Sequence, residues 1–545
     1  MKERGLAAAS LLYWAAALSL GAGPETPLND EWAYAPAAQA LAATGTLPVP
    51  QASVAAFLGQ ALWGALFSRL FGPGYAPLRW SVMVLAWLGG CAFYRLLRRS
   101  GASEEPAAAG TVLLLMNPIF FPLSKTFMTD APGLALTLIG ASLAWPLGGK
   151  DGAARLWLSS IAAGWAGQVR QTALSLPAML GLWSIRAQGK FRVVDGFAVW
   201  TAPALAVLAG GIFFPERAFS RLYLTDAVAR LADPGAWTAA FLRAQASLVY
   251  CGLFALPLAA AVWTDGPLGR LKKISSCRLA AAGILGGTLL VFVLTAGRLP
   301  YPNGIAEAAG LPDFFNHCSY LGSRGLACLN VEGADLRALP LLGAPWFWTL
   351  LGILACASFT TLAALGPATK AAVFLGAVTG LEVLALTGGP AFMDRYILPL
   401  SAFALAWGLH PPSTPHGHAV LWAGVLLTAG ASWAGNADYL RQVAAVKELG
   451  EAAAAQGIPR NRIRAGTEWC WAETGAWLSA PVPGRRIGSW PEAIPNDCLL
   501  KPLAAVSYLP PAALGPRGRT LLSEKRFPSA FGGENRLYLY RQNPP

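Results

Sequence analysis

The chain has 545 residues, of which 55% are hydrophobic and 13% are charged, and its formal net charge is +13. The charged fraction is about half of that found in ordinary soluble proteins, which indicates an integral membrane protein. The excess of Lys and Arg does not indicate nucleic acid as a partner. These residues lie in short loops between apolar segments, where they set membrane topology.

The N-terminal segment carries Lys2 and Arg4 and is then apolar as far as residue 20. Such a segment is either a cleaved signal peptide or a first transmembrane helix. Because no A-x-A cleavage site follows it, we favour the helix. In both cases the chain emerges outside the cytoplasm from residue 25 onward, and residues 22–76 form a first outer loop.

The number of membrane crossings follows from the basic clusters, which the positive-inside rule places in the cytoplasm. Two apolar segments, 54–71 and 77–97, precede the cluster that begins at Arg95, and only one of them can cross. The second is longer and ends in that cluster. The first contains Gln60 and Arg69, so we expect it to lie as a helix in the outer interface.

The later apolar segments then cross the membrane in alternating directions, and every basic cluster falls on the cytoplasmic side. The expected fold is a polytopic α-helical membrane protein with about 13 transmembrane helices, interfacial helices and a small exported C-terminal α/β domain. The N-terminus is expected in the cytoplasm and the C-terminus outside. The transmembrane domain covers residues 1–434, and its further spans are expected near residues 106–124, 131–147, 154–168, 171–186, 193–214, 237–263, 279–297, 345–366, 371–387, 396–410 and 419–434.

Residues 435–545 form the exported domain, because charges, Pro and Gly become frequent there. The pattern predicts helices over 438–456 and 468–478, and strands over 462–465, 504–509 and 536–540. Four cysteines lie in predicted outer segments: Cys318 and Cys328 in the outer loop 298–344, and Cys470 and Cys498 in the tail. We therefore predict two disulfides, one within each segment.

Two short acidic motifs lie at predicted outer edges of membrane helices: Asn29-Asp30-Glu31 in the first loop, and Asp130 at the start of a later helix. A carboxylate near hydrocarbon is costly and needs a partner or a function. The topology places Asp30 and Asp130 on the same face, where they can share one cavity. The alternative is that these residues cap helices and that Glu31 interacts with a helix dipole.

Two arginines fall on the same predicted face. Arg170, followed by Gln171, lies at the tip of two short helices, and Arg395 follows Asp394 at the start of the span 396–410. Because a guanidinium group matches phosphate oxygens, Arg170, Gln171 and Arg395 are candidate phosphate ligands. The alternatives are that Arg170 reaches outer lipid headgroups and that Asp394 neutralises Arg395. The 4 histidines are scattered, so no histidine-based metal site is expected.

Four segments together form a recognisable pattern: Asn29-Asp30-Glu31-Trp32-Ala33-Tyr34 with Ala42-Ala43-Thr44-Gly45, Asn117-Pro118 through Phe127-Met128-Thr129-Asp130, Val169-Arg170-Gln171, and Arg395-Tyr396-Ile397-Leu398-Pro399. The pattern resembles the polyprenyl-phosphate-dependent glycosyltransferases of the C superfold, which include the lipid A aminoarabinose transferase and relatives of the protein O-mannosyltransferases. The resemblance implies that Asp30 is the candidate base and that Asp130 is a second acidic site residue. Some relatives have Lys-Gly where this chain has Arg170-Gln171, so their lysine contacts do not transfer.

The sequence therefore predicts an integral-membrane glycosyltransferase of the hexosyl or pentosyl type. It would move a sugar from a polyprenyl-phosphate donor to an acceptor hydroxyl on the outer face of the plasma (inner) membrane, with inversion. Asp30, Glu31 and Asp130 are the predicted catalytic residues, because an acceptor hydroxyl needs a carboxylate base. The acceptor is a glycan, a lipid or a protein, and membrane lipid surrounds the chain. No definite cofactor is identified, and a divalent cation is left open. The alternatives are a lipid or sugar transporter or flippase, and a non-catalytic envelope assembly protein.

Overall fold

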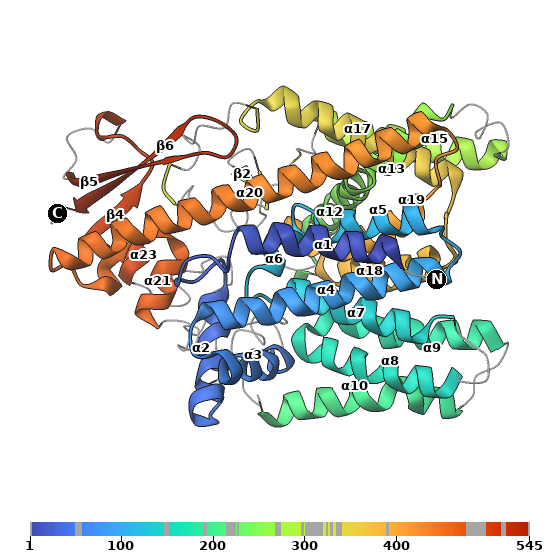
Figure 1. The fold of residues 1–545 in the computed structure, drawn as a ribbon, viewed down its shortest axis with the longest axis horizontal. Coiled ribbons are helices and arrows are strands. Elements are labelled where there is room, and N and C mark those ends of the chain that lie inside the picture. The colour runs from blue at the N-terminus through green and yellow to red at the C-terminus, as the bar shows by residue number, and fades with distance from the viewer. Residues whose placement is uncertain are drawn as a thin grey trace.

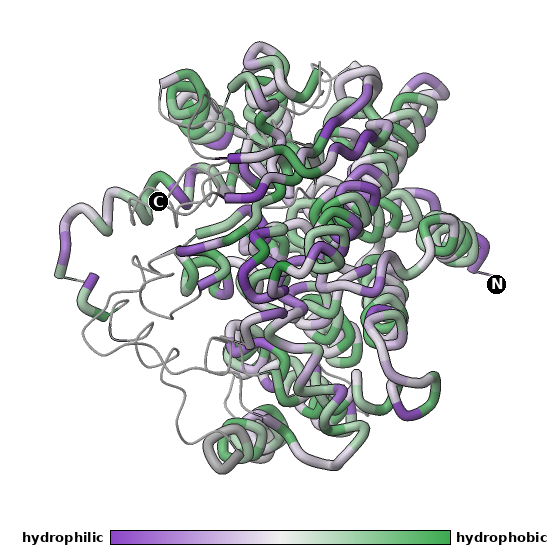
Figure 2. The backbone as a smooth tube through the Cα atoms, turned by 90° about the vertical axis from the view of Figure 1, so that its left-hand side faces the viewer, coloured by the Kyte–Doolittle hydropathy of each residue, from purple (hydrophilic) through white to green (hydrophobic). Residues whose placement is uncertain are grey.

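The computed structural model of the protein describes residues 3–48, 57–146, 152–188, 193–213, 225, 228–230, 232–266, 274–295, 299, 320–322, 325–326, 331–333, 341–387, 392–475, 497–513 and 519–542. Helices dominate these residues, and they stack side by side with a small sheet at one end (Figure 1). Hydrophobic residues predominate along most helices, and hydrophilic positions occur in short stretches (Figure 2).

The first part of the chain forms a compact group of helices in which α4 packs on α7, α7 on α8, and α8 on α10. Small residues allow these close approaches: a Cβ atom on Gly89 would lie 2.6 Å from the Cβ atom of Ala135. The helices of this group are α1 (Arg4–Ser19), α4 (Tyr75–Arg99), α5 (Glu104–Leu115), α6 (Phe120–Ser124), α7 (Asp130–Ala144), α8 (Gly152–Val169), α9 (Ser175–Gln188) and α10 (Val193–Phe213).

The second group packs beside the first, with contacts of α12 on α17, α15 on α17, and α18 on α19. Its members are α12 (Pro234–Phe254), α13 (Leu256–Thr264), α15 (Ser276–Thr295), α17 (Pro345–Leu365), α18 (Lys370–Thr387) and α19 (Pro399–Gly408). Within the described residues, four helices are long and apolar enough to cross a membrane: α4, α15, α17 and α18. Helices α12 and α13 are bent by 57° relative to each other and would form a fifth membrane span if the two are counted as one. The chain is therefore a polytopic α-helical membrane protein by length and composition, and the count of 13 spans stays a prediction.

The predicted span 106–124 is wrong as a continuous helix. It consists of α5 and α6, separated by a turn at Asn117 and Pro118. The side chain of Asn117 stabilises the turn, because its Oδ1 accepts hydrogen bonds from the backbone N–H groups of Ile119 (2.9 Å) and Phe120 (3.3 Å). Asn followed by Pro favours a turn over a helix, since the residue before a proline is disfavoured in the α region.

The separation of the span 419–434 from the helix 438–456 is also wrong. Both belong to α20 (Pro415–Ala455), a single helix of 41 residues that runs from the helical groups to the sheet (Figure 1). At 1.5 Å per residue it is about 60 Å long, more than the hydrocarbon thickness of a bilayer. The predicted domain boundary at residues 434–435 therefore lies inside a helix.

The C-terminal residues form a four-stranded sheet in the order β3-β4-β6-β5. Three of its strands lie where strands were predicted, over 462–465, 504–509 and 536–540, and the fourth, β5, was not predicted. The strands are β3 (Ile463–Arg464), β4 (Ala504–Ser507), β5 (Arg519–Pro528) and β6 (Glu534–Gln542). Helices α21 (Gly466–Thr474) and α23 (Asp497–Leu500) accompany the sheet and are joined by a disulfide between Cys470 and Cys498, which confirms that pair. The predicted pair Cys318 and Cys328 lies outside the described residues.

The first loop contains α2 (Glu31–Thr44) and α3 (Leu58–Phe71), which pack on each other. Helix α3 covers most of the predicted interfacial segment 54–71. Leu62, Leu66 and Leu70 recur every four residues along it and are exposed, so one face of α3 carries an apolar stripe at the surface of the described chain. A stripe of this kind suits contact with lipid.

Candidate active site

Asp30 lies at the start of α2, immediately before Glu31, and its side chain makes no capping hydrogen bond there. Instead, Asp30 Oδ2 accepts a hydrogen bond from Arg395 Nη2 at 2.9 Å. Arg395 belongs to a 3₁₀ turn (Asp394–Ile397) that precedes α19. The Asp30 side chain is 32% exposed and the Arg395 side chain only 10%, so the pair lies at the edge of a buried region with its carboxylate open to solvent.

Asp130 and Arg170 form a second pair, in which Arg170 Nη1 donates to Asp130 Oδ1 at 2.6 Å. Asp130 is the first residue of α7 and follows the N-cap residue Thr129. Arg170 follows α8 and precedes a 3₁₀ turn (Gln171–Leu174). Their side chains are 4% and 13% exposed, so this pair is more deeply buried than the first.

The ring of Tyr396 joins the two pairs. The guanidinium carbon of Arg170 lies 5.2 Å from the ring centroid, and that of Arg395 lies 5.7 Å from it. Both distances allow a cation–π interaction. Four residues that are far apart in the sequence (Asp30, Asp130, Arg170 and Arg395) therefore meet at one site, as the topology predicted. Gln171 is the next residue along from Arg170 and is exposed.

The loop that carries Asp30 is held by polar contacts on both sides. Asn29 has a φ angle of 55°, which is uncommon for a residue other than glycine. Its backbone N–H donates to the hydroxyl of Tyr439 on α20 at 3.1 Å, and its side-chain amide donates to the hydroxyl of Tyr320. Arg395 Nη1 also donates to Asn29 Oδ1 at 3.3 Å. These contacts fix the position of the neighbouring Asp30 carboxylate.

Glu31 has no exposed surface and contacts a different arginine. Arg79 Nε and Nη2 donate to its two carboxylate oxygens at 2.9 and 2.6 Å, and the backbone N–H groups of Leu28 (2.8 Å) and Phe127 (2.7 Å) donate to the same carboxylate. Arg79 is equally buried and also donates to the carbonyls of Ala22, Pro24 and Thr26. The pair ties the first loop to α4 and to the segment before α7.

Further acidic groups surround the two pairs. Asp394 Oδ2 accepts from the backbone N–H of Leu321 at 2.8 Å, and burial raises the pKa of the Asp394 carboxyl to about 7. Glu382 on α18 is buried and accepts from Thr172 Oγ1 at 3.0 Å. Within the described residues, no group of three or more His, Cys, Asp or Glu side chains could hold a metal ion.

Arg395 retains donor capacity besides its pair with Asp30. Its buried Nε–H has no hydrogen-bond partner among the described residues. A buried unpaired donor is unusual in a folded protein and commonly marks a position that water or a ligand fills. Since guanidinium N–H groups match phosphate oxygens, this edge of Arg395 can bind an anion.

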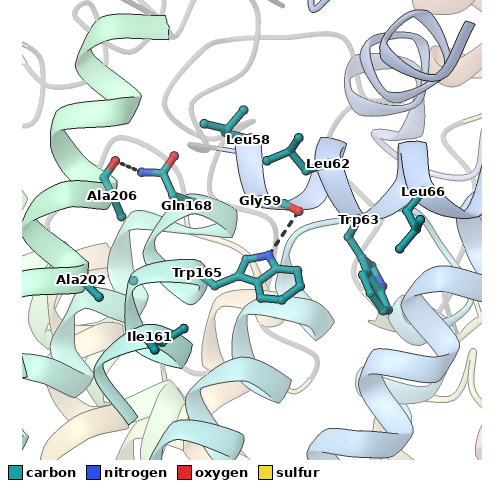
Figure 3. A pocket seen from close by; sticks show the side chains of 11 residues that line it. Leu58, Gly59, Leu62, Trp63, Leu66, Ile161, Trp165, Gln168, Ala202 and Ala206 are labelled. Atoms are coloured by element: carbon teal, nitrogen blue, oxygen red, sulfur yellow. Dashed lines mark hydrogen bonds between the residues drawn. The ribbon is translucent and has the colours of Figure 1, made fainter. Parts of the chain in front are cut away.

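An apolar cavity of about 510 Å³ lies between α3, α8 and α10 (Figure 3). Leu58, Leu62 and Leu66 of α3 line one side, and Ile161, Trp165, Ala202 and Ala206 line the other. Trp165 Nε1 donates to the carbonyl of Gly59 at 3.2 Å, and the side-chain amide of Gln168 donates to the carbonyl of Ala206 (Figure 3). The other polar atom of this side chain, the buried Oε1, has no hydrogen-bond partner among the described residues. Gln168 is two residues before Arg170 of the second Asp–Arg pair.

No model of a protein family matches this chain, and no curated protein matches its sequence. Among solved structures, ArnT from Cupriavidus metallidurans bound to undecaprenyl phosphate is 13% identical, with 99% of this chain and 98% of that chain covered and a TM-score of 0.40. The archaeal oligosaccharyltransferase AglB from Archaeoglobus fulgidus, in complex with an inhibitory peptide and a dolichol-phosphate, is 12% identical, with 82% and 57% covered and a TM-score of 0.39.

The S. cerevisiae protein O-mannosyltransferase Pmt1-Pmt2 complex bound to the sugar donor is 19% identical, with 39% of this chain and 33% of that chain covered and a TM-score of 0.33. This chain thus spans about a third of the length of the yeast chain that it matches. Scores below 0.5 at identities below 20% do not establish the activity of this chain, which therefore rests on its own residues.

Proposed function

We propose that this protein is a glycosyltransferase that moves a sugar from a polyprenyl-phosphate donor to an acceptor hydroxyl on the outer face of the plasma membrane. The observation that carries the proposal is the meeting of two Asp–Arg pairs, Asp30–Arg395 and Asp130–Arg170, around the ring of Tyr396. Carboxylates suit deprotonation of a hydroxyl, and guanidinium groups suit stabilisation of a leaving phosphate.

Asp30 is the base in this proposal. Its side chain is 32% exposed, whereas that of Asp130 is only 4% exposed, so Asp30 is the carboxylate that an acceptor can reach. Arg395 and Arg170 bind the donor phosphate, with the exposed Gln171 beside them. When the phosphate takes hydrogen bonds from Arg395, an oxygen of Asp30 is released to accept the proton of the acceptor. Asp130 keeps Arg170 in place and balances charge near the anomeric carbon.

Direct attack of the acceptor oxygen on the anomeric carbon forms the new glycosidic bond while the bond to the phosphate oxygen breaks. The proton passes from the acceptor hydroxyl to Asp30, and polyprenyl phosphate leaves with the electron pair. A single displacement of this kind inverts the anomeric centre. Asp130 and Asp30 are both engaged by arginines before donor binding, which fits a site that is completed by the donor itself.

The apolar cavity between α3, α8 and α10 is the proposed path of the polyprenyl chain. Two observations support this occupant: the wall is almost entirely apolar, and it includes Gln168, two residues from Arg170. An isoprenoid chain can bury its apolar surface there while its phosphate reaches the guanidinium group. The exposed leucine stripe of α3 places the same cavity beside lipid in this proposal.

We assign Glu31 a structural role and not the catalytic one that its position in the motif suggested. Its carboxylate is fully buried and is engaged by Arg79 and by two backbone N–H groups. A base must present an oxygen to the substrate, and this carboxylate has none exposed.

The test is transfer of labelled sugar by the purified full-length protein in lipid nanodiscs. Undecaprenyl-phosphate-linked hexoses and pentoses serve as donors, and envelope glycans, lipids and peptides serve as acceptors. Transfer that requires the protein supports the proposal. Translocation of the donor between leaflets of a proteoliposome without any transfer would establish a flippase instead. In a Gly74→Cys variant, labelling of the new cysteine only from the cytoplasmic side of cells would contradict the outward placement of the site.

A further inference from the structure

Helix α21, from the C-terminal part of the chain, packs against α2 of the first loop. The indole rings of Trp471 and Trp32 stack with their centroids 4.9 Å apart and an interplanar angle of 17°. Trp32 is two residues from Asp30, and α21 lies near α2 (Figure 1). The C-terminal part therefore forms a wall of the site.

This wall is firmly held. Trp469 packs against α20 at Gly450, where a Cβ atom would lie 3.0 Å from its ring, and its indole N–H donates to the carbonyl of Arg460 at 3.2 Å. The guanidinium of Arg460 lies 4.7 Å from the centroid of a Trp469 ring. The disulfide between Cys470 and Cys498 fixes the helix to α23. Groups on α21 are thus presented to the site from a rigid element.

Thr467 and Glu468, in the first turn of α21, are the polar groups that these contacts leave unused. Their relative exposures are 8% and 9%, yet Thr467 Oγ1 and Glu468 Oε2 have no hydrogen-bond partner among the described residues. Folded proteins satisfy most buried polar groups, so an unpaired buried oxygen calls for water or a ligand as its partner. Here two adjacent side chains offer such oxygens, and they lie on the element next to the proposed base.

Glu468 lies within electrostatic range of the proposed base. Burial raises the pKa of the Glu468 carboxyl to about 8, and the charge of Asp30 acts in the same direction. Burial raises the pKa of Tyr439, and the nearby Glu468 carboxyl acts in the same direction; the Tyr439 hydroxyl accepts from the N–H of Asn29. At neutral pH the carboxyl is therefore mostly protonated, and it can donate a hydrogen bond as well as accept one.

We propose that Thr467 and Glu468 form the acceptor subsite of the enzyme, and that they bind an uncharged sugar residue whose neighbouring hydroxyl is presented to Asp30. This inference rests on the proposed function and names the chemical class of its acceptor. One hydroxyl of the sugar loses its proton to Asp30, and a second oxygen is hydrogen-bonded by Glu468 and Thr467.

The chemistry of the wall favours a sugar over the other acceptors. An anionic acceptor would bring a negative charge close to the carboxylate of Asp30 and to the desolvated carboxyl of Glu468. Two like charges in such surroundings repel each other, so binding of an anion is unfavourable there. A serine or threonine side chain offers a single hydroxyl, which the reaction itself uses. Vicinal hydroxyls of a sugar supply both the reacting oxygen and the oxygen for Thr467 and Glu468.

The test separates reaction of the donor with water from transfer to a sugar. Undecaprenyl-phosphate donors are incubated with the full-length protein in nanodiscs, either alone or with hexyl glycosides of glucose, galactose, mannose and N-acetylglucosamine, or with Ser/Thr peptides. Release of undecaprenyl phosphate reports the donor side, and labelled glycoside reports the acceptor side. The variants are Glu468→Ala, Glu468→Gln and Thr467→Val. Glu473→Gln is the matched control, because Glu473 lies on the same helix but pairs with Arg460.

We expect Glu468→Ala to raise the KM for the glycoside about tenfold or more while donor hydrolysis stays within about twofold. Glu468→Gln restores most of the transfer, since a neutral amide also donates and accepts, and Glu473→Gln behaves as the wild type. An unchanged KM for Glu468→Ala, equal losses of hydrolysis and transfer, or transfer to peptides but not to glycosides overturns the acceptor subsite. Absence of both hydrolysis and transfer in the wild type overturns the proposed function, and the subsite with it.

Discussion

Replacement of Glu31 by Gln distinguishes a structural role of the motif from a catalytic one. The substitution keeps the shape of the side chain but leaves the buried guanidinium of Arg79 without its counter-charge. Removing one partner of a fully buried ion pair costs about 3–5 kcal/mol, which is a large fraction of the 5–15 kcal/mol of stability of a typical domain. The expected result is a clear fall in the thermal unfolding temperature of the protein in detergent.

The structure also predicts which variant of this ion pair loses more stability. Arg79→Met is expected to cost more than Glu31→Gln, because Arg79 additionally satisfies the carbonyls of Ala22, Pro24 and Thr26, and each buried carbonyl left unpaired costs about 1–3 kcal/mol. Arg69→Met is the matched control. Arg69 donates to the carbonyls of Ala42 and Leu41 but is exposed, so its loss should stay within about 0.5 kcal/mol.

Activity measured per folded molecule completes the comparison. Glu31→Gln should retain turnover within about tenfold of the wild type, since losing a general base costs about 10²–10⁴-fold. A variant that unfolds like the wild type but loses turnover by the larger factor would refute the structural assignment and return Glu31 to the list of candidate bases.

Three further outcomes are expected. Arg170→Ala should raise the KM for the lipid-linked donor more than that for the acceptor, whereas Gln171→Ala should have the smaller effect; equal changes in both KM values for Arg170→Ala would contradict its role as a phosphate ligand. Cys470→Ser should lower the free energy of unfolding by about 3.6 kcal/mol, because the disulfide closes a segment with a sequence separation of 28. Peptide mapping of the wild type without reductant should recover Cys470 joined to Cys498, and recovery of both as free thiols would contradict the disulfide. Asp394 has its pKa raised from 3.8 to about 7, so its charged form opposes folding: the stability of the wild type relative to Asp394→Asn should fall as pH rises from about 4 to about 7 and then level off, and a flat difference in unfolding temperature would contradict this.

The sequence predicted which residues meet but not how they pair. Alternating topology was sufficient to place Asp30, Asp130, Arg170 and Arg395 at one end of the helices, because each follows or precedes an apolar segment whose direction the basic clusters predict. The partner of each aspartate depends on how α8 and the turn before α19 pack. Hydropathy carries no information on that packing.

Two features escaped sequence reasoning for identifiable physical reasons. Arg79 lies near the start of the apolar helix α4, so it was counted within a span, and its contact with Glu31 joins residues 48 positions apart. Glu468 was not among the predicted site residues because residues 435–545 were predicted to form a domain separate from the membrane domain that holds the site. The continuous helix α20 contains no Pro after its first turn and no charge between Pro415 and Ala437, so the change of composition near residue 435 marks a change of surroundings and not the end of a helix.

The central claim is tested most directly by transfer from an undecaprenyl-phosphate-linked sugar by Asp30→Asn in nanodiscs. The Asp30 side chain makes no capping hydrogen bond and is 32% exposed, so its replacement by Asn, which has the same shape, should preserve folding and yield. Asp233→Asn is the matched control, because Asp233 also precedes a helix but is exposed and remote in sequence from the site residues. The account predicts a loss of transfer of about 10²–10⁴-fold for Asp30→Asn, with normal transfer by the control. Near-normal transfer by a fully folded Asp30→Asn protein would contradict it.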